Sequence, residues 1–400
     1  MGGSPWPAAR AAAYRAGTEL AATLGDARSG RPRSTWVPVR ECVGSVCAED
    51  VRAPMDLPHF VSSAMDGWAV AGPPPWRLVP GGPPRRPTPL ETGTAAPVLT
   101  GAPLPAGTTA VLRSERGEAA DGLLRATEAV PDGADIRPAG REASRGDLLV
   151  PAGTRLTPAH AAAASVAGID AVRAAVAPRV RLVLTGDEVV EAGIPEPGYV
   201  RDAFQPLLPA AVAGLGGDVR EVVRIGDDRR RTDEEVAADA DVVILTGGTG
   251  RSAADHVRAA LEAMGAELVV DQIDMRPGHP AVLARRNDGA LLVALPGNPL
   301  AAVAALLTLA GPALAGATGR PEEPPRWAAA AEPHAPLPGR HRLIPAALAD
   351  DATGRLLSCD RTGPGMMRGL AGADALMIVP PGGVEDGDPV EFLPLPWSTR

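Results

Sequence analysis

The sequence predicts a multidomain protein that combines α/β and all-β modules. Within residues 179–319, five strand candidates alternate with helix candidates, a pattern typical of right-handed crossovers in a mostly parallel sheet. Within residues 54–150 and again beyond residue 324, short apolar runs are separated by glycine and proline turns, as in small β domains. A chain of 400 residues is also too long for one ordinary hydrophobic core. We therefore expect several modules around a central α/β sandwich.

The N-terminal part of the chain predicts a helical and extended module. Residues 8–25 form an amphipathic helix candidate, and RPRSTWVPVREC follows as an extended arm. Residues 157–169 form a second helix, because Thr157 suits the N-cap and Pro158 the first helical position. We expect this second helix to pack back on the first. The β domain would then be an insertion into a discontinuous N-terminal domain.

The α/β region supplies the remaining strands and helices. Its strand candidates are RVRLVLT, DVREVVRI, DVVILT, ELVVDQIDM and GALLVALP. After a proline-rich linker, the short strands RHRLIPAAL, GRLLSC, ALMIVP and DPVEFLPL favour a C-terminal β-barrel domain. The predicted domains are residues 1–53 with 151–178, residues 54–150, residues 179–323 and residues 324–400.

Composition excludes several classes of function. The formal net charge of -9 argues against a broad nucleic-acid or membrane-surface partner. The three cysteines form no C-x-x-C pair, which favours a reducing, cytoplasmic setting. We expect no signal segment, and we interpret the apolar stretch 300–315 as a buried helix.

Four turns in the α/β region carry unusual residues after predicted strands. Ligands of open α/β sheets bind outside the carboxyl ends of the strands, so we expect these turns to converge on one rim. The turns are Thr185-Gly186-Asp187-Glu188, Thr246-Gly247-Gly248-Thr249-Gly250 with Asp255 and His256 after it, Met275-Arg276-Pro277-Gly278-His279-Pro280, and Pro296-Gly297-Asn298-Pro299.

The residue types at these turns suit a phosphorylated ligand. Glycines allow backbone N–H groups to approach an anion, and a helix start adds a positive dipole end. Carboxylates such as Asp187, Glu188 and Asp255 suit Mg²⁺, which bridges phosphate oxygens. Each motif also has a simpler explanation, since Asn298 and Pro299 form an ordinary helix start and glycine pairs form tight corners. No GxxxxGK[ST] or GxGxxG motif is present.

The inserted β domain contributes the run SSAMDGWAV. Asp66 lies on a glycine turn, where it serves either as a turn cap or as a carboxylate presented to a site shared between modules. Thr100, in VLTGAP, is a second small polar group at a predicted strand end.

Together these motifs resemble the molybdopterin molybdenumtransferase family, which includes the C-terminal domain of the synaptic scaffold protein gephyrin. SSAMDGWAV, LTGAPLPAG, LTGDEVV, ILTGGTG, MRPGHP and LPGNPLAAV occur in that order, and the resemblance covers residues 11–392. It implies an elongated four-domain homodimer with an α/β domain like that of molybdopterin-adenylating proteins. It also implies Mg²⁺-dependent cleavage of adenylated molybdopterin, with molybdate inserted into the dithiolene and AMP released.

The resemblance implies roles for individual residues, with each active site shared between the α/β domain of one subunit and other modules of its partner. Asp66, Glu188, Asp228 and Asp255 match family acids and would be catalytic, with Glu188 and Asp255 holding the metal. The residues that would bind substrate are Thr100, Thr185, Gly186, Asp187, Gly247, Gly248, Thr249, Gly250, Arg276, Pro296, Gly297, Asn298 and Pro299.

The chain also departs from the family pattern. Family polar positions are occupied by Val61, Ser62, Ala203 and Phe204, and family lysine positions by Gln272, Arg276 and His279. These departures leave three alternatives: a divergent paralogue that binds molybdopterin or finished cofactor without catalysis, a molybdopterin adenylyltransferase, and a gephyrin-like scaffold. The expected partners are adenylated molybdopterin and molybdate, with an adenylyltransferase or a recipient molybdoenzyme as protein partner. The sequence does not distinguish molybdate from tungstate.

Overall fold

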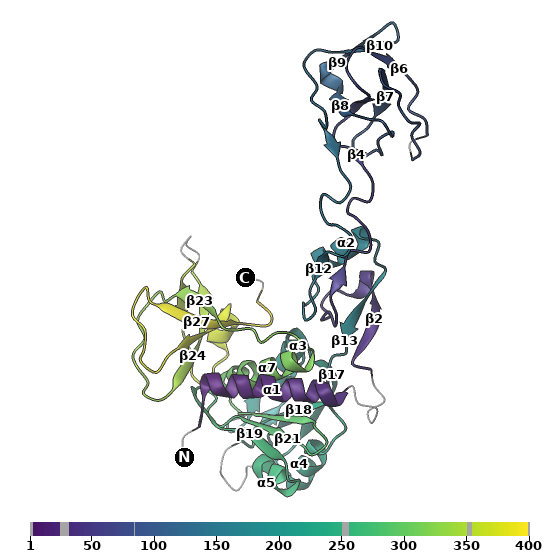
Figure 1. Cartoon of the computed structure of the whole chain (residues 1–400). Helices are drawn as coiled ribbons and strands as arrows, with labels where there is room; N and C mark the ends of the chain where they lie inside the picture. Colours follow the sequence, from purple (N-terminus) through teal and green to yellow (C-terminus); the bar gives the residue numbers. More distant parts are fainter. Residues whose placement is uncertain (1–2, 25–31, 84, 250–255, 350–353, 399–400) are drawn as a thin grey trace.

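The structure is a computed structural model, and it describes residues 3–24, 32–83, 85–249, 256–349 and 354–398. Figure 1 shows an elongated molecule in which a helix-covered body lies beside a C-terminal β module, while an arm carries a separate β module at its far end. The chain runs out along this arm and returns along it, since the far module lies between the two halves of the arm in sequence. The predicted multidomain α/β plus β fold class is confirmed.

Six strands form the central sheet of the body in the order β17, β14, β18, β22, β21, β19. The first four are parallel, whereas β21 runs antiparallel to both of its neighbours. The four parallel strands end at one edge, which is the edge that the sequence motifs occupy. The bounds are β14 (Arg179–Thr185), β17 (Asp218–Ile225), β18 (Val242–Thr246), β19 (Glu267–Asp271), β21 (Val282–Arg285) and β22 (Leu291–Leu295).

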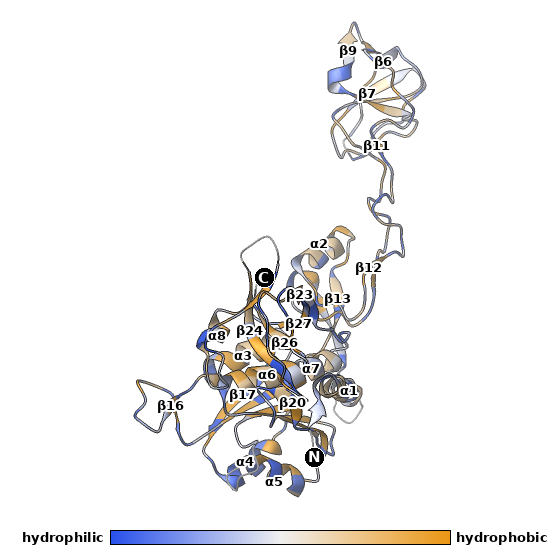
Figure 2. Ribbon diagram, turned by 90° about the vertical axis from the view of Figure 1, so that its left-hand side faces the viewer, coloured by the Kyte–Doolittle hydropathy of each residue, from blue (hydrophilic) through white to orange (hydrophobic). Residues whose placement is uncertain are grey.

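Helices cover both faces of this sheet because its strands are apolar on both sides (Figure 2). In β18, Val242 and Ile244 pack in the larger core, while Val243 and Leu245 pack in the core on the opposite face. The helices of the larger core are α1 (Trp6–Leu24), α3 (Phe204–Leu215), α6 (Pro299–Ala305) and α7 (Gly311–Ala317), and those of the other face are α4 (Arg229–Val236) and α5 (His256–Ala263).

The N-terminal helix α1 packs on the α/β body, so our expectation that it pairs with the helix at 157–169 is wrong. Its buried face is made largely of small residues, which let two helix backbones touch. A Cβ at Gly17 would overlap the carbonyl of Ala313, and one at Gly316 would overlap the carbonyl of Tyr14. Close contact of this kind holds α1 against α7 in the body, whereas the helix at 157–169 lies in the arm.

Residues 299–317 form one continuous apolar helix, with a π-helical segment, Leu306–Ala310, between α6 and α7. In the described part of the chain it is the one helix long and apolar enough to cross a membrane by length and composition alone. Every residue of its most apolar window is buried inside the protein, as expected for residues 300–315.

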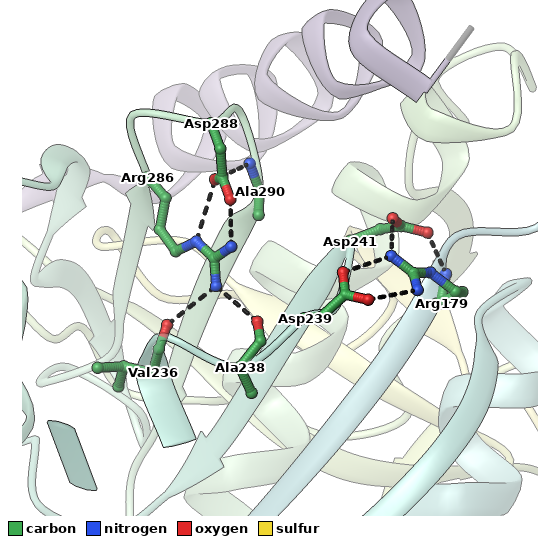
Figure 3. Close-up of polar contacts among 8 residues, drawn as sticks. All are labelled: Arg179, Val236, Ala238, Asp239, Asp241, Arg286, Asp288 and Ala290. Atoms are coloured by element: carbon green, nitrogen blue, oxygen red, sulfur yellow. Dashed lines mark hydrogen bonds and ion pairs between the residues drawn. The ribbon is translucent and has the colours of Figure 1, made fainter. Parts of the chain in front are cut away.

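Two arginines tie the opposite, amino-terminal edge of the sheet together (Figure 3). Arg286 donates Nη1 to the carbonyls of Val236 (3.2 Å) and Ala238 (2.7 Å), and it also pairs with Asp288. The hairpin before β22 is thereby fixed to the end of α4. Arg179 makes the second node, with Asp239 and Asp241. Both arginines form ion pairs within the protein and connect neighbouring loops, so we assign them a structural role at this edge of the sheet.

The arm is built from two strand pairs and a short helix. In it, β2 (Ser34–Pro38) pairs with β13 (Ala171–Ala175), and β3 (Val51–Arg52) pairs with β12 (Leu148–Val150). Helix α2 (Pro158–Val166) packs on this region, and Thr157 caps it by accepting from the N–H of His160, as predicted.

The far module is an all-β sheet of six strands, in the order β8, β5, β7, β6, β10, β9. Trp76, Leu112 and Leu124 are its largest fully buried side chains. The bounds are β5 (Gly67–Val70), β6 (Trp76–Leu78), β7 (Thr94–Val98), β8 (Ala110–Arg113), β9 (Gly117–Ala120) and β10 (Leu123–Ala126).

The C-terminal module is a curled β-sheet, which agrees with the predicted barrel. A bridge between Ala330 and Leu356 joins the end of β23 to β25, so the strands close around a small core. The sheet also recruits β1 (Ser4–Pro5) and β20 (Ile273–Arg276) from elsewhere in the chain. The module's own strands are β23 (Arg326–Ala329), β24 (His341–Leu348), β25 (Leu356–Ser358), β26 (Ala375–Val379) and β27 (Pro389–Pro394).

Candidate functional site

Three of the four turns singled out in the sequence meet at the carboxyl edge of the central sheet. The strands β14, β18 and β22 are direct neighbours, so the turns that follow them are neighbours too. Gly247 donates its N–H to the carbonyl of Leu295 at 2.9 Å, and a Cβ on Gly297 would lie 3.7 Å from the Cα of Gly247. The turns that follow these strands therefore lie side by side at this edge, and their glycines leave much of the backbone without side chains.

Two threonines at this edge, Thr185 and Thr246, join the ends of β14 and β18 through side-chain hydrogen bonds. The Oγ of Thr185 donates to the carbonyl of Thr246, and the N–H of Thr185 donates to the Oγ of Thr246 at 3.2 Å. Gly247 follows directly, with a φ of 78°, and a Cβ there would lie 2.5 Å from the Oγ of Thr185. Both the left-handed backbone and this close approach require glycine at position 247.

The turn Pro296-Gly297-Asn298-Pro299 begins the long apolar helix. Asn298 occupies the N-cap position and Pro299 the first helical position, as the sequence predicts. The side chain of Asn298 makes no capping hydrogen bond and is exposed. Asn298 is therefore free to contact a ligand, which a simple capping role would not require.

Acidic side chains from two loops flank the glycine turns. Asp187 and Glu188 are exposed, and Asp187 accepts from the N–H of Asp227 at 3.3 Å. Asp228 is the N-cap of α4 and accepts from the N–H of Arg231 at 2.7 Å. One carboxylate oxygen of Asp228 is thus used to cap a helix, a structural role that its sequence motif did not reveal.

The turn Met275–Pro280 does not belong to this sheet, so our expectation of four consecutive strand ends is wrong there. Its strand β20 pairs with β24 and β1 in the C-terminal sheet, where Arg276 is exposed and lies opposite Arg342. The ring Nδ1 of His279 lies 2.6 Å from the carbonyl of Ile273, to which it donates. The turn still approaches the helix start, because a Cβ on Gly278 would lie 3.3 Å from the carbonyl of Ala301.

The predicted metal ligands are only partly visible. Asp255 and Gly250 lie outside the described residues, so the structure does not test them. Among the residues that are described, no three His, Cys, Asp or Glu side chains gather as a metal cluster would. Mg²⁺ commonly binds through one or two carboxylates together with substrate phosphates and water, so Asp187 and Glu188 fit that donor set.

Asp66 and Thr100 lie in the far β module, remote from the glycine turns of the same chain. The Oδ1 of Asp66 accepts from the N–H of Thr100 at 2.6 Å and from its hydroxyl at 2.7 Å. These two hydrogen bonds lower the pKa of the Asp66 carboxyl below its ordinary value. Asp66 is therefore a fixed, ionised carboxylate on an exposed turn.

A loop of the C-terminal module also reaches the rim, and sequence analysis did not find it. The carbonyl of Pro364 accepts from the N–H of Ala301 at 3.2 Å, and a Cβ on Gly365 would lie 3.3 Å from the Oδ1 of Asn298. The only sequence signal is the short Gly-Pro-Gly run at 363–365, which predicts a turn but not its neighbour. Conversely, Phe204, at a family polar position, is buried in the larger core.

Three family models match almost the whole chain. They are the MoeA N-terminal region (domain I and II) over residues 10–168, a probable molybdopterin binding domain over residues 181–316, and the MoeA C-terminal region (domain IV) over residues 328–395. Their order along the chain follows the arm with its far module, the α/β body and the C-terminal module.

Individual relatives are similar over most of their length. A molybdopterin molybdenumtransferase from Synechococcus elongatus is 33% identical, with 66% of this chain and 70% of that protein covered. Molybdopterin molybdenumtransferase 2 from Mycobacterium tuberculosis is 29% identical, with 88% and 92% covered. A crystal structure of the molybdopterin biosynthesis MoeA protein from Pyrococcus horikoshii superposes with a TM-score of 0.72 at 26% identity, covering 90% of this chain and 94% of that one.

Proposed function

This chain belongs to the molybdopterin molybdenumtransferase family, and from that membership we propose that it inserts molybdate into adenylated molybdopterin and releases AMP. It is a transferase of molybdenum cofactor biosynthesis. One observation carries the proposal: three adjacent strand ends place glycine turns, the start of a long helix and exposed acids at one edge. That combination suits a pyrophosphate next to a cation.

The glycine turns and the helix start would hold the phosphates. At Gly247 and Gly248, φ values of 78° and 61° bend the backbone sharply after β18. Neither residue has a side chain, so an anion can approach the main chain closely. The helix that begins at Pro299 runs without a break to residue 317, and its dipole favours negative charge beside Asn298. A protein with a net charge of -9 needs this kind of local positive potential.

Glu188 would hold Mg²⁺ together with Asp255, as the family resemblance implies. Asp187 is an exposed acid next to Glu188. When bound, Mg²⁺ neutralises phosphate charge and polarises the phosphorus. The chain's own contribution is orientation: the hydrogen bonds between Thr185 and Thr246 fix the ends of β14 and β18, and the carbonyl of Pro364 accepts from the N–H of Ala301 at the start of the long helix. Loss of Glu188 would cost on the order of a hundredfold in rate.

We propose a homodimer, because Asp66 and Thr100 are too remote to reach the glycine turns of their own chain. The far module of one subunit would instead face the α/β rim of its partner. Mixing two impaired variants, each lacking one of the residues of the shared site, tests this arrangement. A mixture of Asp66→Ala and Glu188→Ala chains should recover activity, since a mixed dimer contains one site with both residues intact. No recovery in a mixture shown to exchange subunits would contradict the shared site.

The function itself is tested by incubating the full chain with adenylated molybdopterin, Mg²⁺ and molybdate, and by following AMP by mass spectrometry. We expect AMP to be released in proportion to the molybdenum inserted. Glu234→Gln is a matched control, because Glu234 is an acid on α4 that forms surface ion pairs with Arg230 and Arg231. Consumption of ATP with free molybdopterin, without AMP release from the adenylated form, would instead indicate an adenylyltransferase.

We also propose a cytoplasmic enzyme. Cys42, Cys47 and Cys359 are free thiols, and burial raises the pKa of each, which leaves them poorly reactive. Such thiols suit a reducing compartment.

A further inference from the structure

A pocket of about 430 Å³ opens beside Asp66 in the far β module. Its walls are largely apolar, since five prolines and Trp68 contribute to them. Leu99 also lines the pocket, and 70% of it is exposed. The prolines are residues 83, 87, 97, 103 and 105. A pocket of this size, with few polar groups, is typical of a small-molecule site.

Asp66 is the one carboxylate that lines this pocket. Its Oδ1 is engaged by Thr100, whereas its Oδ2 accepts no hydrogen bond from the residues that the structure describes. A carboxylate oxygen has two lone pairs, so Oδ2 can accept hydrogen bonds from a ligand. The hydroxyl of Thr100 keeps acceptor capacity next to it. Ser114, a further polar side chain that lines the pocket, donates its hydroxyl proton to Glu115 and also keeps acceptor capacity. The side chains at the polar end of the pocket are therefore acceptors, and they select a ligand edge made of donors.

We propose that this pocket binds the pterin ring of the substrate, with Asp66 accepting hydrogen bonds from its 2-amino and N3–H edge. This inference rests on the proposed function, which supplies molybdopterin as the substrate. A pterin presents two neighbouring N–H donors on one edge, and hydrogen bonds from such donors to an ionised carboxylate are strong. Its flat faces would lie against the proline walls and Trp68.

The same reasoning excludes the adenine of the substrate from this pocket. Beside its 6-amino group, adenine presents N1, which is an acceptor and would face the Asp66 carboxylate without a proton between them. Two acceptors that face each other without a proton between them repel, so the pocket disfavours adenine at this position. The adenylate half is thereby assigned to the glycine turns of the α/β rim, and Asp66 to recognition of the other half. Asp66 would act on binding, in contrast to the catalytic role that its motif implies.

Binding of free pteridines to the full chain tests the inference. Pterin and lumazine have the same ring, but lumazine has a carbonyl in place of the 2-amino group. We expect the wild-type chain to bind pterin at least tenfold more tightly than lumazine, as followed by pteridine fluorescence. Asp66→Asn should abolish the preference. Glu118→Gln, an exposed acid on β9 of the same module outside the pocket, should retain it. Leu99→Ser should weaken both ligands equally.

The outcomes are distinguishable from failure of the proposed function. If the chain releases AMP from adenylated molybdopterin but shows no pterin preference, the pocket assignment is overturned and the function stands. If Asp66→Asn lowers the maximal rate and leaves the KM unchanged, the assignment is also overturned. GMP serves as a third probe because guanine has the same donor edge. GMP binding as tight as pterin binding would show that the pocket does not select the pterin.

Discussion

Replacing Gly247 with alanine tests whether the turn after β18 leaves no room for a side chain next to Thr185. The left-handed φ of 78° costs an alanine about 1–2 kcal/mol. The new Cβ would lie 2.5 Å from the Oγ of Thr185, so that hydroxyl must move and lose its hydrogen bond to Thr246. The lost bond costs about 1 kcal/mol and the local strain about 1–3 kcal/mol. We therefore expect a local destabilisation of about 3–6 kcal/mol.

The double mutant separates the two contributions. In a Thr185→Ala background the clash is absent and the hydrogen bond already lost, so Gly247→Ala should cost only about 1–2 kcal/mol. Thr185→Ser is the matched control, because it keeps the Oγ and should keep the full cost. Because the chain has several modules, the local free energy is best taken from hydrogen exchange of peptides that cover β18 and β22. Additive effects in the Thr185→Ala background would refute the proposed contact.

Three further perturbations address other parts of the molecule. Arg286→Leu should lower protection of α4 by about 2–4 kcal/mol in hydrogen exchange, because two carbonyls and Asp288 lose their partner, and unchanged protection would contradict this. Asp228→Ala removes the cap of α4 and should cost about 1 kcal/mol of stability, whereas Asp228→Asn keeps the cap. A large loss of AMP release in the Asn variant, whose helix is still capped, would identify Asp228 as catalytic. Thr100→Val removes a hydrogen bond that lowers the pKa of Asp66, so the pKa of Asp66 should rise. As the pH is lowered, the variant should therefore lose pterin binding at a higher pH than the wild type, and identical pH profiles would count against the role of the Asp66 carboxylate.

The rim could be predicted from sequence where its geometry follows from neighbouring strands. Strands β14, β18 and β22 each lead into a turn with glycine, and parallel strands must end at one edge. The turn at Arg276 could not be placed in this way. Its strand β20 pairs with β24 and β1, which lie far away in sequence, and no local pattern specifies such partners. The Pro364 contact was missed for the same reason, since only the folded C-terminal module brings it to Ala301.

The sequence of the N-terminal helix carries a signal for close contact with another helix. Ala9, Ala13 and Gly17 recur every four residues and form one narrow stripe of small side chains. Such a stripe favours backbone contact with another helix, which is what α1 makes with α7. An amphipathic pattern alone shows that a helix has a buried face, but it does not identify the surface that covers that face.

The position of α1 has a consequence for synthesis of the protein. The indole of Trp6 donates to the hydroxyl of Thr308, a partner that lies 302 residues later in the chain. At a translation rate of about 5–20 residues per second, the helix leaves the ribosome roughly 15–60 s before that partner exists. During this interval its apolar face must be shielded by something other than its native site. A nascent chain of this enzyme is thus a candidate client for holding chaperones, and the N-terminal helix is the segment that they would bind.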